Sequence, residues 1–153
     1  RSEDDRLCLL KGIQDGTIDI IATDHAPHSK GDKLNTFDAA PAGINGSETA
    51  MSIMLDLVNK NEINLENIIT SMCNNPGSIL NDILNLKIGK IKKGFKADIA
   101  ILDEKYDVEI TEDFFVSKSI NSPLLRSFLK GKVNMTIFDG KIIYEDKEWK
   151  KYI

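Results

Sequence analysis

Residues 18–33 read IDIIATDHAPHSKGDK, and this stretch is the main indication of the fold of the chain. A nearly unbroken apolar run over residues 18–22 stops abruptly at Asp24. Such a run, bounded by turn residues, predicts a strand buried on both faces, as in parallel sheets that helices cover. Functional side chains in these architectures lie at the carboxyl ends of the strands. Asp24 is therefore placed to act as a metal ligand or general base, although a turn-capping role would also suit an aspartate here.

The only two histidines of the chain, His25 and His28, lie in the same turn as Asp24, with Pro27 stiffening the backbone between them. Histidine and aspartate together are typical of metal centres and of general acid–base catalysis. Neighbours along a strand point in opposite directions, so His25 is expected to face away from the side that Asp24 faces. We expect a packing or supporting role for His25 and not metal ligation.

The composition narrows the class of protein. With 41% hydrophobic and 29% charged residues, the 153-residue chain is typical of a soluble globular domain. A net charge of −4 gives no positive electrostatic field that would attract nucleic acid. No apolar segment is long enough for a transmembrane helix. Cys8 and Cys73 form no CxxC pair, which argues against a structural zinc site and favours a reducing, cytoplasmic location with both cysteines as small buried residues.

Residues 1–87 are predicted to be an αβ-type segment. Ser2 followed by Asp5 matches a capping box, which predicts a helix that ends near Gly16. Ser47 is expected to cap a second helix, and a third is expected to start after Asn64 and to break at residues 75–77, which read NPG.

Residues 88–153 are predicted to be mostly β-structure. Short β-type runs alternate with turns over residues 88–103, and residues 106–110 predict another strand. Asp139 and Gly140 separate two alternating apolar runs, 133–138 and 141–144, and a DG pair in this position is a strong hairpin signal. The predicted boundary between the two parts lies at residues 87 and 88.

The long connection from residue 29 to residue 45 is also a candidate for function. Loops of this length inside compact domains are usually functional or mobile. It ends in the sequence APAGING, whose glycines allow backbone amides to approach a ligand closely, although a plain turn into the next helix is equally consistent with it.

The motif ATDHAPH at residues 22–28, with Lys33 following five residues after His28, closely resembles the signature of the dihydroorotases in the cyclic amidohydrolase superfamily. The similarity continues along essentially the whole chain, in the segments 1–6, 15–19, 41–43, 46–49, 74–76, 89–94, 97–99 and 121–133.

This resemblance implies an α/β fold: the eighth strand and helix of a (β/α)8 TIM barrel, within residues 1–87, followed by part of a small C-terminal β-sandwich in residues 88–153. It implies a zinc-dependent, reversible hydrolysis of dihydroorotate to N-carbamoyl-L-aspartate in pyrimidine synthesis. It also implies a small-molecule substrate, a homodimer and a possible association with aspartate transcarbamoylase, with no nucleic-acid or membrane partner.

Residue by residue, the resemblance assigns Asp24 as the catalytic residue and a zinc ligand. His28 is assigned to substrate binding, together with the backbone of Ala42 and Gly43. Zinc generates a hydroxide nucleophile at neutral pH, and a carboxylate can carry its proton to the departing nitrogen. Zinc normally takes four ligands, so we expect the remaining ligands of one or two zinc ions upstream of this segment. The chain, which begins at Arg1 as if in mid-fold, is accordingly expected to be a fragment that is inactive alone.

Two alternatives stay open at this stage. The first is another cyclic amidohydrolase, such as a hydantoinase or allantoinase, although the second histidine of the motif argues against it. The second is a non-catalytic homologue that acts as a structural partner of aspartate transcarbamoylase. Intact Asp24 and His28 weigh against loss of catalysis.

Overall fold

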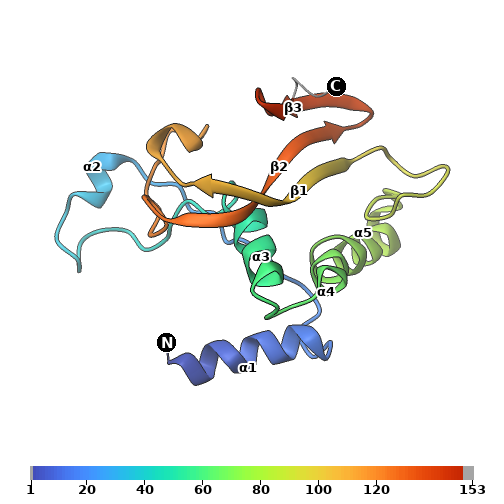
Figure 1. Cartoon of the computed structure of the whole chain (residues 1–153), viewed down its shortest axis with the longest axis horizontal. Helices are drawn as coiled ribbons and strands as arrows, with labels where there is room; N and C mark the ends of the chain where they lie inside the picture. The colour runs from blue at the N-terminus through green and yellow to red at the C-terminus, as the bar shows by residue number, and fades with distance from the viewer. Residues whose placement is uncertain (1, 150–153) are drawn as a thin grey trace.

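The computed structural model describes residues 2–149, which form a helical first part and a three-stranded antiparallel sheet (Figure 1). In chain order the elements are α1 (Glu3–Gln14), α2 (Lys30–Lys33), α3 (Ala50–Asn59), α4 (Leu65–Ile69), the π-helical turn η1 (Thr70–Asn74), α5 (Asn75–Leu84), β1 (Ile99–Glu109), the 3-10 turn η2 (Glu112–Phe114), β2 (Phe128–Phe138) and β3 (Lys141–Glu145). No helix of the described residues is both long and apolar enough to cross a membrane.

Helix α1 begins as its sequence predicts. The Ser2 hydroxyl accepts the N–H of Asp5, and the Asp5 carboxylate accepts the N–H of Ser2, so the capping box is complete. Three acidic residues in the first turn interact favourably with the positive end of the helix dipole.

The strand predicted over residues 18–22 is wrong: this segment has no regular secondary structure, and Ile20 is 38% exposed. Two hydrogen bonds attach it to the helical layer, from the N–H of Ile21 to the carbonyl of Ser71 and from the Asn75 amide to the carbonyl of Asp19. A parallel strand needs a neighbouring strand beside it, and residues 2–149 supply none next to this segment.

The predicted break at residues 75–77 is also wrong, since helical structure continues from Leu65 to Leu84. The π-helical turn η1 lies directly before Pro76, and the N–H of Asn75 reaches back to the carbonyl of Thr70. Proline has no N–H and its ring crowds the preceding turn, so a locally widened turn lets the helix pass through it.

The β-hairpin prediction is confirmed. Strands β2 and β3 pair antiparallel around Asp139 (φ 48°) and Gly140 (φ 77°), the two positive φ angles of a type I′ turn. The predicted strand over 106–110 forms the end of the longer strand β1, which pairs with β2 with register shifts between Ile101 and Leu102 and between Asp103 and Asp107. Residues 88–98 are turns and irregular structure.

Helix α3 packs against β2, as Figure 1 shows, and this contact joins the two parts of the chain. Leu55 of α3 is fully buried and lies over Gly131 of β2, while the Asp56 carboxylate accepts the N–H of Lys130. A second apolar cluster forms where β1 ends, around Val108, Ile110 and Phe115.

Two smaller expectations are corrected. Cys8 and Cys73 are exposed and free, not buried, because neither of the helices that carry them is covered on that side. The N-cap position of helix α3 is occupied by Thr49 and not by Ser47, and the Thr49 side chain makes no capping hydrogen bond.

Candidate functional site

Asp24 directly follows the segment 18–23, within a stretch that has no regular secondary structure. Its φ angle of 44° is in the left-handed region, which aspartate tolerates better than most residues. The residue is exposed, and within residues 2–149 its carboxylate has no hydrogen-bond or ion-pair partner. An exposed carboxylate without a partner is available to bind a metal ion, a water molecule or a substrate.

His25 faces the start of the α3 region. Its Nδ1 accepts the N–H groups of Gly46 and Ser47, each at 3.2 Å. The N–H of Ala26 also donates to the carbonyl of Ile44 at 2.9 Å, so the two loops are joined side by side. This agrees with the supporting role expected of His25, which anchors one loop to the other.

His28, Ala42 and Gly43 are brought together by the structure. Nε2–H of His28 donates to the carbonyl of Ala42 at 2.9 Å. Gly43 has a φ of 114°, and a Cβ built there would lie 2.5 Å from Cβ of Ala26 and 3.4 Å from Nε2 of His28. Only glycine therefore allows this close approach of the two loops. Within the described residues no hydrogen bond or ion pair joins the Asp24 side chain to this cluster.

Two further side chains hold the same loop, although sequence reasoning assigned neither to the site. The Lys33 ammonium donates to the carbonyls of Pro41 and Gly43, and the Asn121 amide donates to the carbonyl of Gly43. Lys33 belongs to the motif already singled out, so its position in the sequence was a usable signal. Asn121 comes from a distant segment, and only the tertiary structure brings it here.

A buried polar connection lies behind the loop. Asn45 is fully buried, and its amide group donates to a Glu48 carboxylate oxygen and to the carbonyl of Ser119. The other carboxylate oxygen of Glu48 accepts the N–H groups of Val116 and Ser117. These contacts fix the candidate site to the segment that joins β1 and β2.

A metal ion would find few ligands here. Within residues 2–149 no group of three or more histidine, cysteine, aspartate or glutamate side chains could hold one. Asp24 supplies one carboxylate, which falls short of the four ligands that zinc normally takes. The described residues therefore do not form a metal site by themselves.

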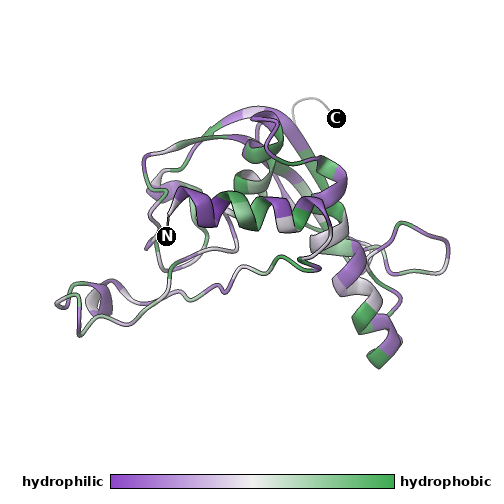
Figure 2. Ribbon diagram, turned by 90° about the horizontal axis from the view of Figure 1, so that it is seen from below, coloured by the Kyte–Doolittle hydropathy of each residue, from purple (hydrophilic) through white to green (hydrophobic). Residues whose placement is uncertain are grey.

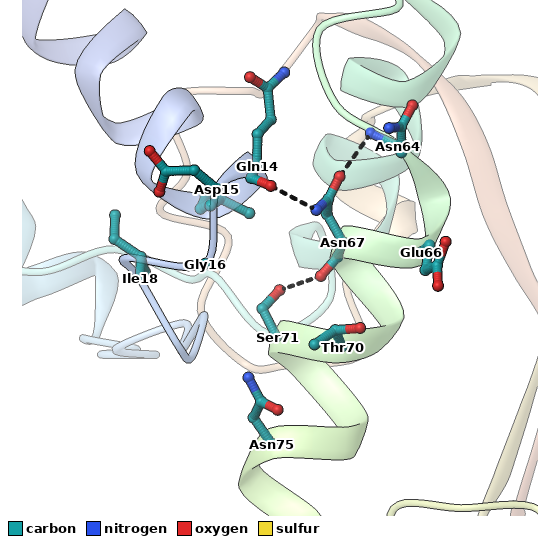
Figure 3. Close-up of a pocket in the computed structure, with 11 residues that line it drawn as sticks. Gln14, Asp15, Gly16, Ile18, Asn64, Glu66, Asn67, Thr70, Ser71 and Asn75 are labelled. Atoms are coloured by element: carbon teal, nitrogen blue, oxygen red, sulfur yellow. Dashed lines mark hydrogen bonds between the residues drawn. The ribbon is translucent and has the colours of Figure 1, made fainter.

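Two cavities within the described residues have linings that do not include Asp24. A polar pocket of about 300 Å³ lies between the end of α1 and the helical segment that starts at α4. Hydrogen bonds join three of its lining residues, Gln14, Asn67 and Ser71 (Figure 3). An apolar groove of about 280 Å³ runs along one side of the segment 21–23, against Ile53 and Met54 of α3.

Comparisons with known proteins agree with this geometry. The chain is 45% identical over 150 residues to the dihydroorotase of Clostridium acetobutylicum, a match that covers 96% of this chain and 34% of that protein. It is 46% identical over 145 residues to the dihydroorotase of Clostridioides difficile, covering 94% of this chain and 33% of that protein. The chain thus spans about one third of the length of the curated relatives that it matches.

Solved structures show the same fold. The L-hydantoinase (dihydropyrimidinase) of Arthrobacter aurescens superimposes with a TM-score of 0.85 at 28% identity, over 95% of this chain and 33% of that one. A dihydropyrimidinase of Brevibacillus agri gives a TM-score of 0.86 at 20% identity, over 96% of this chain and 32% of that one, and supports the fold alone. The family model described as "Amidohydrolase family" matches residues 1–143, so the chain belongs to the amidohydrolase family.

Proposed function

We propose that this chain is the part of a dihydroorotase that carries the catalytic carboxylate and a substrate-binding loop. The observation that carries the proposal is the 45% identity to a dihydroorotase over 150 residues, which include the complete Asp24-to-His28 motif. The reaction is the reversible hydrolysis of dihydroorotate to N-carbamoyl-L-aspartate. The TIM-barrel unit in residues 1–87 and the β-sandwich segment in residues 88–153 belong to the same proposal.

In this mechanism Asp24 carries the proton. It takes a proton from the water whose oxygen bonds to the ring carbonyl carbon, and it gives that proton to the ring nitrogen as the carbon–nitrogen bond breaks. The free carboxylate of Asp24 in the structure is consistent with this role. His28 and the backbone of Ala42 and Gly43 bind oxygen atoms of the substrate and so orient it.

The metal requirement is part of the proposal. Amidohydrolases generally depend on a metal, and we propose one or two zinc ions with Asp24 as one ligand. The other ligands would have to come from residues outside this chain, because the described residues offer no cluster of three. The cytoplasmic location is supported by two free cysteines. A homodimer and a complex with aspartate transcarbamoylase remain proposals drawn from the resemblance.

The test uses the protein at the full length of its relatives. Purified enzyme is given dihydroorotate, hydantoin and dihydrouracil separately, and ring opening is followed by chromatography of the products. We expect dihydroorotate to be opened fastest, and Asp24→Asn to lower kcat by roughly 10²–10⁴-fold. Asp38→Asn, a change at another exposed carboxylate of the same connection, serves as the control and should leave kcat unchanged.

Each alternative predicts a different result. Faster opening of hydantoin would favour a hydantoinase, as the superposition on the Arthrobacter aurescens enzyme allows. Absence of turnover on all three rings, together with co-purification of aspartate transcarbamoylase, would favour the non-catalytic partner.

A further inference from the structure

The loop that carries α2 projects from the rest of the chain (Figures 1 and 2). Lys33 bonds to the backbone of this loop. It lies at the end of α2, whose first turn is capped by the Ser29 hydroxyl. From there its partly buried Nζ donates to the carbonyl of Pro41 at 2.6 Å and to the carbonyl of Gly43 at 2.7 Å. The Lys33 ammonium thus connects the residue before segment 34–40 with the residues after it.

The backbone of residues 41–43 is consequently held by side chains. Lys33 binds two of its carbonyls, Nε2–H of His28 binds the carbonyl of Ala42, and the Asn121 amide donates to the carbonyl of Gly43 at 3.2 Å. In this way all three consecutive carbonyl groups are held by side chains from two parts of the chain, the motif that contains His28 and Lys33 and the distant Asn121.

Fixing these carbonyls also fixes the N–H groups. The peptide bonds here are trans, and in a trans peptide the N–H points opposite to the carbonyl of the preceding residue. The bound carbonyls of Pro41 and Ala42 therefore direct the N–H groups of Ala42 and Gly43 away from Lys33 and His28. Within residues 2–149 neither N–H has an acceptor. Two adjacent free donors can bind a carboxylate or carbonyl oxygen.

We propose that Lys33 is a positioning residue, which holds this backbone so that the N–H groups of Ala42 and Gly43 can bind the oxygen atoms of the substrate. This inference rests on the proposed function. Lys33 acts through the loop and not on the substrate, because two of its three N–H donors already bind carbonyls. Bonds from a charged donor are the strong ones, so loss of the ammonium should release the loop.

The kinetic test compares Lys33→Met with Lys30→Met in the protein at the relatives' full length. Lys30 lies in the same short helix and is exposed, and within the described residues its ammonium has no hydrogen bond or ion pair, so it is a matched control. We expect Lys33→Met to raise KM for dihydroorotate roughly tenfold and to change kcat less, since substrate binding is lost and the proton carrier stays. Lys33→Arg keeps the charge and the donors and should recover part of the loss. Kinetic constants of Lys33→Met equal to those of Lys30→Met would overturn the proposal.

Hydrogen–deuterium exchange, measured by mass spectrometry on the same proteins, separates this inference from the proposed function. Lys33→Met should speed exchange in the peptide that contains residues 41–46, where the N–H of Asn45 donates to the carbonyl of Asn121, and should leave β1 and β2 unchanged. Unchanged exchange in residues 41–46 rejects the role of Lys33 whatever the activity. Faster exchange in a protein that opens no dihydroorotate rejects the proposed function and keeps Lys33 as the residue that orders the loop.

Discussion

At the scale of single residues, the contact between the two loops of the candidate site depends on the absence of a side chain at Gly43. A Cβ there would lie 2.5 Å from Cβ of Ala26, well inside the sum of the van der Waals radii. Ala26 in turn donates its N–H to Ile44, so the loops cannot separate without losing that hydrogen bond. Gly43 therefore contributes to the site by its lack of a side chain, which allows the two loops to pack closely.

The first prediction compares Gly43→Ala with Gly94→Ala. Both glycines have positive φ angles, but a Cβ on Gly94 would meet nothing within 4 Å. Gly94→Ala should cost only the backbone strain, about 1 kcal/mol, whereas Gly43→Ala should lower the free energy of unfolding by about 1–3 kcal/mol more. Urea denaturation measures both, and equal losses would show that the loops do not touch as described.

At the scale of elements, the packing of α3 on β2 depends on another close approach. A Cβ on Gly131 would lie 2.3 Å from Cβ of Leu55, which is fully buried. Helix and strand meet at this point with no room for a methyl group. The adjacent hydrogen bond from the N–H of Lys130 to the Asp56 carboxylate fixes the register of helix against strand.

We therefore predict that Gly131→Ala lowers the free energy of unfolding by about 3 kcal/mol, because either the helix moves away or the strand is distorted. Gly140→Ala is the control, since it lies in the β2–β3 turn with a similar positive φ and open space around it. Thermal unfolding followed by circular dichroism compares them. A Gly131 variant as stable as the Gly140 variant would contradict the described packing.

The residues that follow β3 are attached to the sheet by a charged cluster. Burial opposes ionisation of Asp146, but the N–H groups of Trp149 and Glu148 and the Lys132 ammonium outweigh it and hold the pKa of this carboxyl below its ordinary value. Lys132 also lies 3.6 Å from the ring centre of Tyr106. The hydrogen bond from its hydroxyl to the Glu148 carboxylate raises the pKa of Tyr106 to about 12.

This cluster gives a pH prediction. Because the pKa of Asp146 is lower in the folded chain than in the unfolded chain, its stabilisation is present above the unfolded value of about 4 and is lost as the pH falls through the folded value. Asp146→Asn should therefore lower the free energy of unfolding by about 1 kcal/mol at pH 7, and should lower it less at pH 3. Asp113→Asn, at an exposed aspartate in η2, is the control. An equal effect of Asp146→Asn at both pH values would contradict the assignment.

At the scale of the whole molecule, the chain leaves much apolar surface uncovered. Ile20, Ile44 and four apolar residues of α5 (Ile79, Leu80, Ile83 and Leu84) are exposed, and an apolar groove lies beside residues 21–23. The candidate site is likewise open, with one free carboxylate and no cluster of metal ligands in the described residues. Both features agree with a chain that matches about one third of each relative.

We predict that the 153-residue chain alone neither retains zinc in stoichiometric amount after dialysis nor opens dihydroorotate. Metal analysis by mass spectrometry and a product assay test this directly. The protein at the relatives' full length, purified in the same way, is the positive control. Turnover by the isolated chain would show that the missing ligands were wrongly placed outside it.

Sequence by itself determined the features that depend on short-range chemistry. The capping box of Ser2 and Asp5, the Asp139–Gly140 hairpin and the grouping of Asp24 with two histidines follow from neighbours within a few residues. The family followed from the same motif, and the comparisons confirm it.

Three features were decided only by the tertiary structure. Residues 18–22 form no strand, and the helix continues through Pro76. Lys33 and Asn121 hold the loop at Ala42 and Gly43. The reason is physical: an apolar run becomes a strand only when another strand satisfies its backbone groups, and Asn121 reaches Gly43 only after the chain has folded. A local sequence pattern does not identify the distant residues that a segment contacts after folding.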